Sequence, residues 1–542
     1  MSKIFARGVL RIPLPGQCAD LEQLAAAVLS GVLLSFSFAG PAVHPLAFVA
    51  FVPLLWSCER LPPRAAFMHG WACGVSFFAI SLSWLIETIR GYTSLDLLLS
   101  STLILLLALV LGVFPGAATV AAQLVARRFA ATAAGESAHR TETVVRALLF
   151  PWTWVASEYL RAWIMGFGWN SVGYSQYRAL PIIQVADVGG VYLVSAVLVC
   201  ANCALYSLLR VPGWRARLGS AAIPALVVGA ALGYGQLRLQ QVVRQLETAP
   251  QVSVAVVQNN IEQHTKWLPQ MTNVWVSRQL RLTRTVLAEA AAAKARIDVI
   301  IWPEGAVTVD LDRDNAVRRR VTREVASLGA HLVLGAGATA RSSDAPTNTV
   351  FHISPDGRIV NRYDKIRLVP FGEYVPYQSI LFFVKKMVWQ PAEFAVGEEF
   401  TKFHINGARL SPYICYETAF PELLRQFVAG KEGARMLVNV TNDAWFGASW
   451  GPEQHWAMTA LRAVENRVPI ARAAQTGISG FVSATGEILM QGPRFVEGAW
   501  WARLGLGVEP SLYTRAGDVF AIVVTSLMLA VTGLTALRRP AN

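Results

Sequence analysis

Charged side chains are scarce in this sequence. Aspartate, glutamate, lysine and arginine make up 15% of the 542 residues, whereas a soluble domain carries about 25%. Hydrophobic residues make up 54%, and the mean hydropathy is +0.40. This composition excludes an ordinary soluble protein. It indicates a chain that crosses a membrane several times.

Eight apolar runs are candidate spans, because a spanning helix needs about 20 apolar residues. The second run is short and the fifth contains Glu158 and Arg161, so these two fit the pattern least well. The first run lacks a convincing cleavage site and is expected to act as an uncleaved anchor. The candidate spans are Leu21–Ala39, Pro45–Trp56, Ala66–Ile86, Leu97–Ala121, Val144–Ile164, Val185–Leu209, Ser220–Gly235 and Val519–Leu537.

Lysine and arginine cluster at alternate ends of these runs. Basic residues precede the first span, follow the second, fourth and sixth, and close the chain, whereas the intervening short loops carry Arg90 and Arg178. Cytoplasmic loops carry the basic excess, so eight spans place the stretch from about Arg238 to Asp518 outside the cytoplasm. Much of the formal charge of +13 is this excess. No patch of interleaved basic and aromatic residues indicates a nucleic-acid partner.

Cysteine is also scarce, and its distribution is uneven. Five of the six cysteines fall in the membrane part, where the spacing of Cys200 and Cys203 inside an apolar helix indicates helix packing. Cys415 is the only cysteine of the long polar stretch. A lone thiol in an oxidising compartment is a liability, so its presence suggests a chemical task. The histidines of this stretch lack ligand spacing, and we expect neither a metal nor a cofactor.

From Gln251 onward the pattern changes to alternating strands and helices. Apolar strands separated by amphipathic helices predict an α/β sandwich whose sheets are covered by helices. Active groups of such folds gather at the carboxyl ends of strands, where Glu304, Cys415 and Asn442 are expected to lie. The expected strands are Val252–Gln258, Asp298–Trp302, His331–Gly335, a hairpin over Asn348–Ile359, Leu410–Tyr416 and Met436–Val440. The expected helices are Asn273–Lys294, Ala316–Ser327 and Phe420–Ala429.

Two groups could complete a thiol acyl-transfer site around Cys415. Glu304 follows an apolar strand and a proline, where partial desolvation would raise its pKa toward that of a general base. Lys365 could lower the pKa of a neighbouring thiol and stabilise a tetrahedral oxyanion. Each residue has an ordinary alternative, because Glu304 could be a structural acid and Lys365 a surface lysine.

Two further acids accompany these groups. Glu373 could orient Lys365. Glu417 lies two residues beyond Cys415 and would share its strand face if the strand continued. It could equally be an acid in the first turn of the following helix.

These segments together resemble the carbon-nitrogen hydrolase (nitrilase) superfamily, in which a glutamate, a lysine and a cysteine occupy matching contexts in this order. That resemblance covers about Gln251 to Gly492. The whole chain is similar to the apolipoprotein N-acyltransferase family. The matching motifs are Lys266-Trp267, Trp302-Pro303-Glu304, Leu368 to Pro376 (LVPFGEYVP), Cys415-Tyr416-Glu417, Asn439 to Gly447 (NVTNDAWFG) and Gln475 to Gly480 (QTGISG).

The resemblance implies a polytopic membrane domain that carries an extracytoplasmic α-β-β-α sandwich. It implies a bacterial inner-membrane enzyme that moves an acyl chain from a phospholipid to the N-terminal diacylglyceryl-cysteine of an apolipoprotein, through a thioester on Cys415. Glu304 would be the base and Lys365 the oxyanion donor. The resemblance also implies that Glu373 and Glu417 support the site, and that Trp267 and Tyr416 shape it.

The segment Ser379–Pro391 combines apolar and aromatic residues with a lysine pair. This composition is typical of an interfacial arm, so we expect a lid that contacts lipid headgroups. An internal helix packed on the domain core is the alternative. The expected lid contacts are Phe382, Phe383, Val388 and Trp389.

Two other classes of function share these features. A membrane-tethered amidase or hydrolase would use the same three groups with water as acceptor. A transporter or sensor would only bind a ligand, but Cys415 and the few charges inside the spans argue against it. We expect a monomer with three regions: residues 1–237 with seven spans, 238–510 with the catalytic domain, and 511–542 with the last span.

Overall fold

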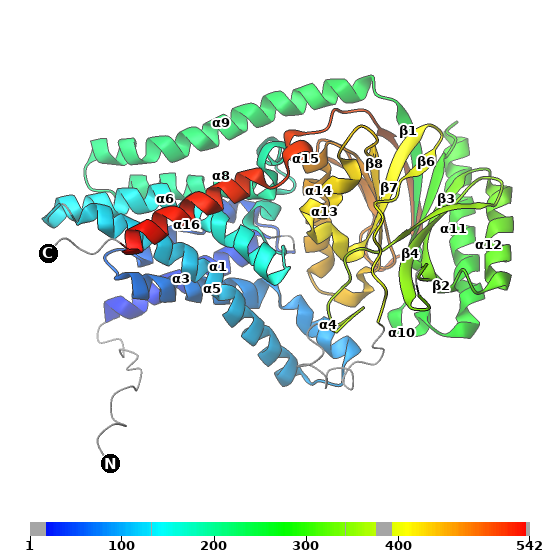
Figure 1. Ribbon diagram of the computed structural model, residues 1–542, viewed down its shortest axis with the longest axis horizontal. Helices are drawn as coiled ribbons and strands as arrows, with labels where there is room; N and C mark the ends of the chain where they lie inside the picture. The colour runs from blue at the N-terminus through cyan, green and yellow to red at the C-terminus, as the bar shows by residue number, and fades with distance from the viewer. Residues whose placement is uncertain (1–17, 39, 132, 342, 376–392, 538–542) are drawn as a thin grey trace, which may run out of the picture.

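The computed structural model divides into a helical part and a part built on two β-sheets (Figure 1). It describes residues 18–38, 40–131, 133–341, 343–375 and 393–537. The helical part is formed by the N-terminal half of the chain, together with the last helix, which returns to it from the sheets (Figure 1). The α/β stretch therefore lies between the N-terminal group of helices and the last apolar helix.

Four described helices, α5, α8, α9 and α16, are long and apolar enough to cross a membrane, or five if the bent pair α3 and α4 forms one span. Helix α8 is largely surrounded by other helices, whereas α5, α9 and α16 expose most of their apolar surface, which suits lipid contact. The helices are α1 (Cys18–Ser37), α2 (Val52–Ser57), α3 (Pro63–Ser81), α4 (Trp84–Tyr92), α5 (Leu97–Ala130), α6 (Gly135–Met165), α7 (Leu180–Ile183), α8 (Ala186–Arg210), α9 (Trp214–Glu247) and α16 (Val519–Leu537), with 3₁₀ turns η1 (His44–Phe48) and η2 (Val172–Gln176).

Two of the eight expected spans are divided in the structure, and one more contains buried charged residues. The second is divided into η1 and α2. The third is broken by a bend of 54° between α3 and α4. The fifth lies within α6, whose polar residues Glu158 and Arg161 are buried. Buried polar groups of this kind need internal partners rather than lipid.

Two six-stranded sheets form the second part. Their strand orders are β12-β1-β2-β3-β4-β5 and β11-β10-β9-β8-β7-β6. Strands β1, β2 and β3 are parallel, as are β7, β8 and β9. The strands are β1 (Gln251–Gln258), β2 (Val299–Asp310), β3 (His331–Thr339), β4 (Pro346–Ile353), β5 (Ile359–Asp364), β6 (Phe403–Ile405), β7 (Ala408–Ile414), β8 (Met436–Thr441), β9 (Ile470–Ala474), β10 (Gly480–Val482), β11 (Ile488–Gln491) and β12 (Gly498–Gly505).

Helices cover the outer face of each sheet, which confirms the expected α-β-β-α sandwich (Figure 1). Alternate residues of β1 enter different cores: Val254 and Val256 face the second sheet, and Ala255 and Val257 face α11 and α12. Both faces of the strand are thus buried, as its apolar run predicts. The helices of this part are α10 (Gln263–Lys266), α11 (Thr272–Ala292), α12 (Asn315–Leu328), α13 (Pro421–Val428), α14 (Gly451–Asn466) and α15 (Leu512–Ala516), with 3₁₀ turns η3 (Pro269–Met271), η5 (Cys415–Ala419) and η6 (Asp443–Phe446).

The layer formed by α13 and α14 lies between the second sheet and the membrane helices (Figure 1). Asp187 of α8 binds Arg467, which follows α14, with 2.7 Å between its Oδ2 and the guanidinium. The same oxygen accepts from Arg238 of α9 at 2.8 Å. Helix α9 continues to Glu247, past the expected domain boundary, and leads directly into β1. The two parts therefore share helices, ion pairs and one apolar core.

Candidate active site

Cys415 lies where β7 ends and the 3₁₀ turn η5 begins. Its φ is +50°, in the left-handed region. A residue other than glycine costs about 1–3 kcal/mol in such a conformation, which persists only when its surroundings enforce it. The residue is 7% exposed, and its thiol forms a hydrogen bond with Thr441 at the end of β8. The turn thus places a buried thiol at the carboxyl edge of the second sheet.

Glu304 lies inside β2 rather than beyond its end. Regular pairing with β3 stops after Trp302 and resumes at Val307, so Glu304 occupies an irregular stretch of the strand. The expectation that the strand ends at Trp302 is therefore wrong, because sequence patterns do not reveal a bulge of this kind. Gly305 adopts a φ of +58° there, and a Cβ on it would lie 2.7 Å from Lys266 Nζ.

Lys365 follows β5 and reaches the same edge. Strand β4 is antiparallel to β3 and β5 is antiparallel to β4, so β5 runs in the direction of β2 and ends at the same edge of the sheet, with β3 and β4 between them. Lys365 Nζ donates to Glu373 Oε1 at 2.9 Å and lies 3.8 Å from Glu304 Oε1. Its side chain is buried, so both ion pairs are shielded from water.

Asn348, near the start of β4, joins these two carboxylates. Its Nδ2 donates to Glu304 Oε1 at 2.7 Å and to Glu373 Oε1 at 2.8 Å. Both amide hydrogens are thereby used, which fixes the side chain. Sequence reasoning missed Asn348, although the expected hairpin begins with it. Glu304 Oε2 is buried and has no hydrogen-bond partner among the described residues, so it can accept a proton.

The site is strongly coupled electrostatically. Burial raises the pKa of the Cys415 thiol to about 12, Glu304 adds to this effect and Lys365 opposes it. Burial lowers the pKa of Lys365, but the charges of Glu373 and Glu304 outweigh it and raise the pKa above its usual value. Lys365 thus stays charged, whereas Cys415 is a neutral thiol that needs a base to become a nucleophile.

A second buried lysine, Lys266, lies beside the site. Its Nζ donates to the Glu304 carbonyl oxygen at 3.2 Å and to Gln475 Oε1 at 2.5 Å. Burial lowers its pKa to about 8, against the opposing charges of Glu304 and Cys415. Trp267 is 48% exposed, and its ring lies 5.0 Å from Lys266 Nζ. The motif Lys266-Trp267 therefore supports the irregular stretch of β2 that carries Glu304.

Glu417 joins the loop of Lys365 to the turn of Cys415. Strand β7 ends at Ile414, so Glu417 does not share a strand face with Cys415 and instead lies in the first turn of η5, which is the alternative that the sequence left open. Its carboxylate accepts from the backbone of Ile414 at 2.6 Å, from Ile366 at 2.8 Å and from Tyr363 Oη at 2.7 Å. Burial raises the pKa of Glu417, and these hydrogen bonds oppose the shift.

The loop formed by residues 166–178 of the membrane part reaches this edge. Tyr416 Oη donates to the Gly166 carbonyl oxygen at 3.4 Å. Arg161 donates to the Trp169 carbonyl oxygen at 2.5 Å, and Glu158 Oε1 accepts from Val172 N at 2.8 Å. The two charged residues of α6 thus hold the loop against the turn that carries Cys415.

The structure brings together Glu304, Lys365, Glu373 and Cys415, and it places Glu417, Tyr416 and Trp267 around them. The lid residues Phe382, Phe383, Val388 and Trp389 lie outside the described residues. Within the described part of the chain, no group of three histidine, cysteine, aspartate or glutamate residues could bind a metal ion.

Comparisons with known proteins agree with this arrangement. A family model described as Carbon-nitrogen hydrolase matches residues 253–508, so the two sheets form a domain of the nitrilase superfamily. A second family model, the Apolipoprotein N-acyltransferase N-terminal domain, matches residues 30–204. The chain belongs to the apolipoprotein N-acyltransferase family and is an acyltransferase.

Relatives named Apolipoprotein N-acyltransferase match this chain over most of its length, and three of them illustrate the similarity. The protein of Geobacter metallireducens is 38% identical over 504 residues, which cover 91% of this chain and 92% of the relative. The protein of Azotobacter vinelandii is 31% identical, and the match covers 97% of this chain and 96% of the relative. The protein of Allorhizobium ampelinum is 32% identical, and the match covers 93% of this chain and 94% of the relative.

Proposed function

We propose that this protein transfers a fatty-acyl chain from a membrane phospholipid to the N-terminal diacylglyceryl-cysteine of an apolipoprotein, the last step of lipoprotein maturation. The observation that carries the proposal is a buried neutral thiol beside a lysine that stays charged and a carboxylate oxygen that has no hydrogen-bond partner among the described residues. Family membership supplies the acyl-transfer reaction.

In the first half-reaction, Glu304 takes the proton of the Cys415 thiol. The thiolate attacks the carbonyl carbon of the sn-1 ester, and the tetrahedral oxyanion forms near Lys365. One N–H of Lys365 donates to Glu373, which leaves donors for the oxyanion. The ester C–O bond then breaks, Glu304 returns its proton to the leaving oxygen, and lysophospholipid departs from the thioester.

In the second half-reaction, the α-amine of the diacylglyceryl-cysteine attacks the thioester. Glu304 takes a proton from the amine, the C–S bond breaks, and the thiolate of Cys415 regains the proton. A covalent intermediate lets two bulky lipids use one site in turn. Glu373, Asn348 and Glu417 would hold the charged groups in place, and Trp267 and Tyr416 would line the entrance.

A membrane-tethered amidase would use the same groups with water as acceptor. The burial of Cys415 disfavours this alternative, because a thioester that survives until the lipoprotein arrives must be kept from water. A transporter or sensor would not need a nucleophile in a strained turn, so this alternative is also disfavoured.

The membrane arrangement is part of the proposal. The distribution of basic residues supports a multi-pass protein of the bacterial inner membrane with its sheets on the periplasmic side. Basic residues lie at both ends of the chain, so both ends are placed in the cytoplasm and the number of spans must be even. We propose eight spans. We also propose that the enzyme is a monomer with regions 1–237, 238–510 and 511–542.

The decisive measurement is the intact mass of the purified protein and of Cys415→Ser after incubation with phospholipid. We expect a fatty-acyl increment on the wild type alone, removed by hydroxylamine and discharged by a diacylated lipopeptide. Discharge by water at the same rate would favour the hydrolase. An increment on neither protein would exclude lipid thioester chemistry.

A further inference from the structure

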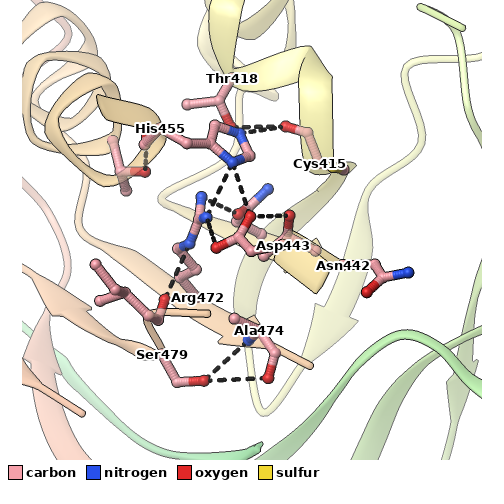
Figure 2. Close-up of polar contacts among 12 residues, drawn as sticks. Cys415, Thr418, Asn442, Asp443, His455, Arg472, Ala474 and Ser479 are labelled. Carbon is pink, nitrogen blue, oxygen red and sulfur yellow. Dashed lines mark hydrogen bonds and ion pairs between the residues drawn. The ribbon is translucent and has the colours of Figure 1, made fainter. Parts of the chain in front are cut away.

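A buried polar cluster forms hydrogen bonds with the backbone carbonyl of Cys415 (Figure 2). The carbonyl oxygen of Cys415 lies 3.0 Å from His455 Nε2 and 2.9 Å from Thr418 Oγ1. A carbonyl oxygen only accepts hydrogen bonds, so His455 Nε2 carries a hydrogen and donates it. We call His455, Thr418, Asp443 and Arg472 the carbonyl clamp.

The other nitrogen of the imidazole faces an ion pair. His455 Nδ1 lies 3.0 Å from Asp443 Oδ1 and 3.0 Å from an Arg472 nitrogen, and Arg472 binds Asp443 Oδ2 at 2.7 Å. All three side chains are fully buried. Because the aspartate and the arginine already neutralise each other, a neutral imidazole leaves the cluster without net charge. In that state Nε2 donates and Nδ1 accepts from Arg472, whereas a hydrogen on Nδ1 would donate to Asp443 and give the cluster a positive charge.

Two effects keep the imidazole neutral. Burial and the charge of Arg472 lower the pKa of His455, and Asp443 opposes them. Burial opposes ionisation of Asp443, but the charge of Arg472 holds the pKa of that carboxyl below its usual range. Both shifts favour a neutral imidazole beside an ionised carboxylate.

This arrangement differs from a Cys-His-Asp catalytic triad, in which the histidine would face the sulfur and take its proton. Here the histidine faces the carbonyl of the same residue, and the sulfur faces Thr441, Glu304 and Lys365. The role of base is already filled by Glu304. The clamp instead acts on the backbone whose left-handed conformation directs the thiol.

Aromatic rings prevent the imidazole from swinging away. The ring of Trp169, from the membrane part, lies 5.7 Å from that of His455 at an angle of 31°. Phe446 lies 5.8 Å away on an edge contact. His455 is thus enclosed by both parts of the molecule.

We propose that His455 is a positioning residue for acylation, which donates through Nε2 to the Cys415 carbonyl and thereby holds the thiol toward Glu304 and Lys365. The proposal rests on the proposed role of Cys415 as the nucleophile. A small displacement of a reacting group costs up to about 100-fold in rate, so loss of the clamp should slow the chemical step.

Two substitutions of His455 separate the donor from mere packing. In His455→Gln the amide nitrogen replaces Nε2, whereas in His455→Asn it replaces Nδ1 and cannot reach the carbonyl. We would measure single-turnover acylation of the full chain in mixed micelles of phosphatidylethanolamine by intact mass. His455→Asn should acylate about 10- to 100-fold more slowly at saturating lipid, with an unchanged half-saturating lipid concentration. His455→Gln should restore most of the rate.

Equal rates for both variants, or rates that follow only the loss of thermal stability, would overturn the proposal. If His455→Asn does not fold, Thr418→Val and Thr418→Ser decide, because only serine keeps the second donor. Equal rates for these two would also overturn it. Alkylation of Cys415 by iodoacetamide should follow the same order. This second readout does not require thioester formation, so a failure of the proposed function would be seen separately.

Discussion

The thiol of Cys415 lies between two charges that act in opposite directions. Glu304 raises its pKa and Lys365 lowers it. The two residues also have different proposed tasks, since the carboxylate removes a proton and the ammonium stabilises an oxyanion. A substitution at either position should therefore slow acyl transfer, but the two substitutions should shift the thiol pKa in opposite directions.

Glu304→Gln and Lys365→Met test this at the level of single residues. Glu304→Gln should lower the thiol pKa and Lys365→Met should raise it, and the pH dependence of alkylation by iodoacetamide measures both. Acylation by phospholipid should fall by about 100- to 10,000-fold in Glu304→Gln, because general-base catalysis is lost. Glu289→Gln, on the exposed face of α11, is the matched control and should change neither quantity. Shifts of the same sign would contradict this picture of the site.

Lys266 gives the folded state a pH-dependent stability. Burial lowers its pKa to about 8 from 10.5. Between these two values the unfolded chain keeps the proton that the folded chain has lost, so stability should rise with pH by at most about 1.4 kcal/mol per unit. Below pH 8 both states are protonated and this dependence disappears.

Lys266→Met should remove that dependence. Thermal unfolding in detergent at pH 7.5 and 9.5 would measure it. Between these pH values the Tm of the wild type should rise by about 2–4 °C more than the Tm of the variant. Only the change with pH counts, because the substitution also removes the bond to Gln475 at every pH. A constant difference between the two proteins would show that Lys266 does not titrate in this window.

At the level of elements, strong apolar periodicity made the first half of the sandwich predictable. Of the elements expected from Val252 to Val440, those for β1, β7, β8 and α11–α13 agree within a few residues, whereas β2 and β3 run beyond the expected ends and β5 begins where the expected hairpin stops. The resemblance to known families indicated which side chains to examine. Asn348 was missed because its importance depends on the contact of its side chain with that of Glu304 in β2, which no local pattern encodes.

The second half of the sandwich could not be predicted in the same way. Strand β9 (Ile470–Ala474) contains Arg472, and helix α14 (Gly451–Asn466) contains Arg462 and Glu465, all fully buried. An amphipathic pattern is recognised because its charged residues lie on the exposed face. Charged residues that are buried break this pattern. Their partners, such as Asp443 for Arg472, come from distant segments.

Helix α4 carries a further prediction at this scale. It follows the 54° bend after α3 and packs on η6, the turn next to the carbonyl clamp. Thr88 Oγ1 donates to the Trp445 carbonyl oxygen at 2.8 Å, and the rings of Tyr92 and Trp445 lie 4.0 Å apart. A hydrogen bond and an aromatic pair together stabilise this contact by about 2 kcal/mol.

The double variant Thr88→Val, Tyr92→Leu should release η6 from α4. Hydrogen exchange of the amides of residues 443–447 should become about 10- to 30-fold faster, while exchange in β1 and β2 stays unchanged. Arg90→Gln, an exposed position on the same helix, serves as control. Unchanged exchange at η6 would mean that the second sheet alone holds the turn.

At the scale of the whole molecule, the membrane helices and the sandwich form one structural unit. The apolar core runs from α1 to β10 without a break. Asp187 of the membrane part is the main ionic link, because its carboxylate accepts from Arg467, Arg238 and Tyr234. Arg467 belongs to the sandwich and is fully buried, and within the described part of the chain Asp187 supplies its counter-charge.

Asp187→Asn should therefore destabilise both parts at once. Removing one partner of a buried ion pair leaves the other uncompensated and costs about 3–5 kcal/mol. Arg238→Gln removes a more exposed partner and should cost about 1 kcal/mol or less, because the pair of Asp187 with Arg467 remains.

Thermal unfolding of the detergent-solubilised protein, followed by proteolysis of each part, measures both effects. A single transition shifted to lower temperature in Asp187→Asn agrees with one cooperative unit. Two separate transitions would mean that the sandwich folds on its own and that the membrane helices only anchor it.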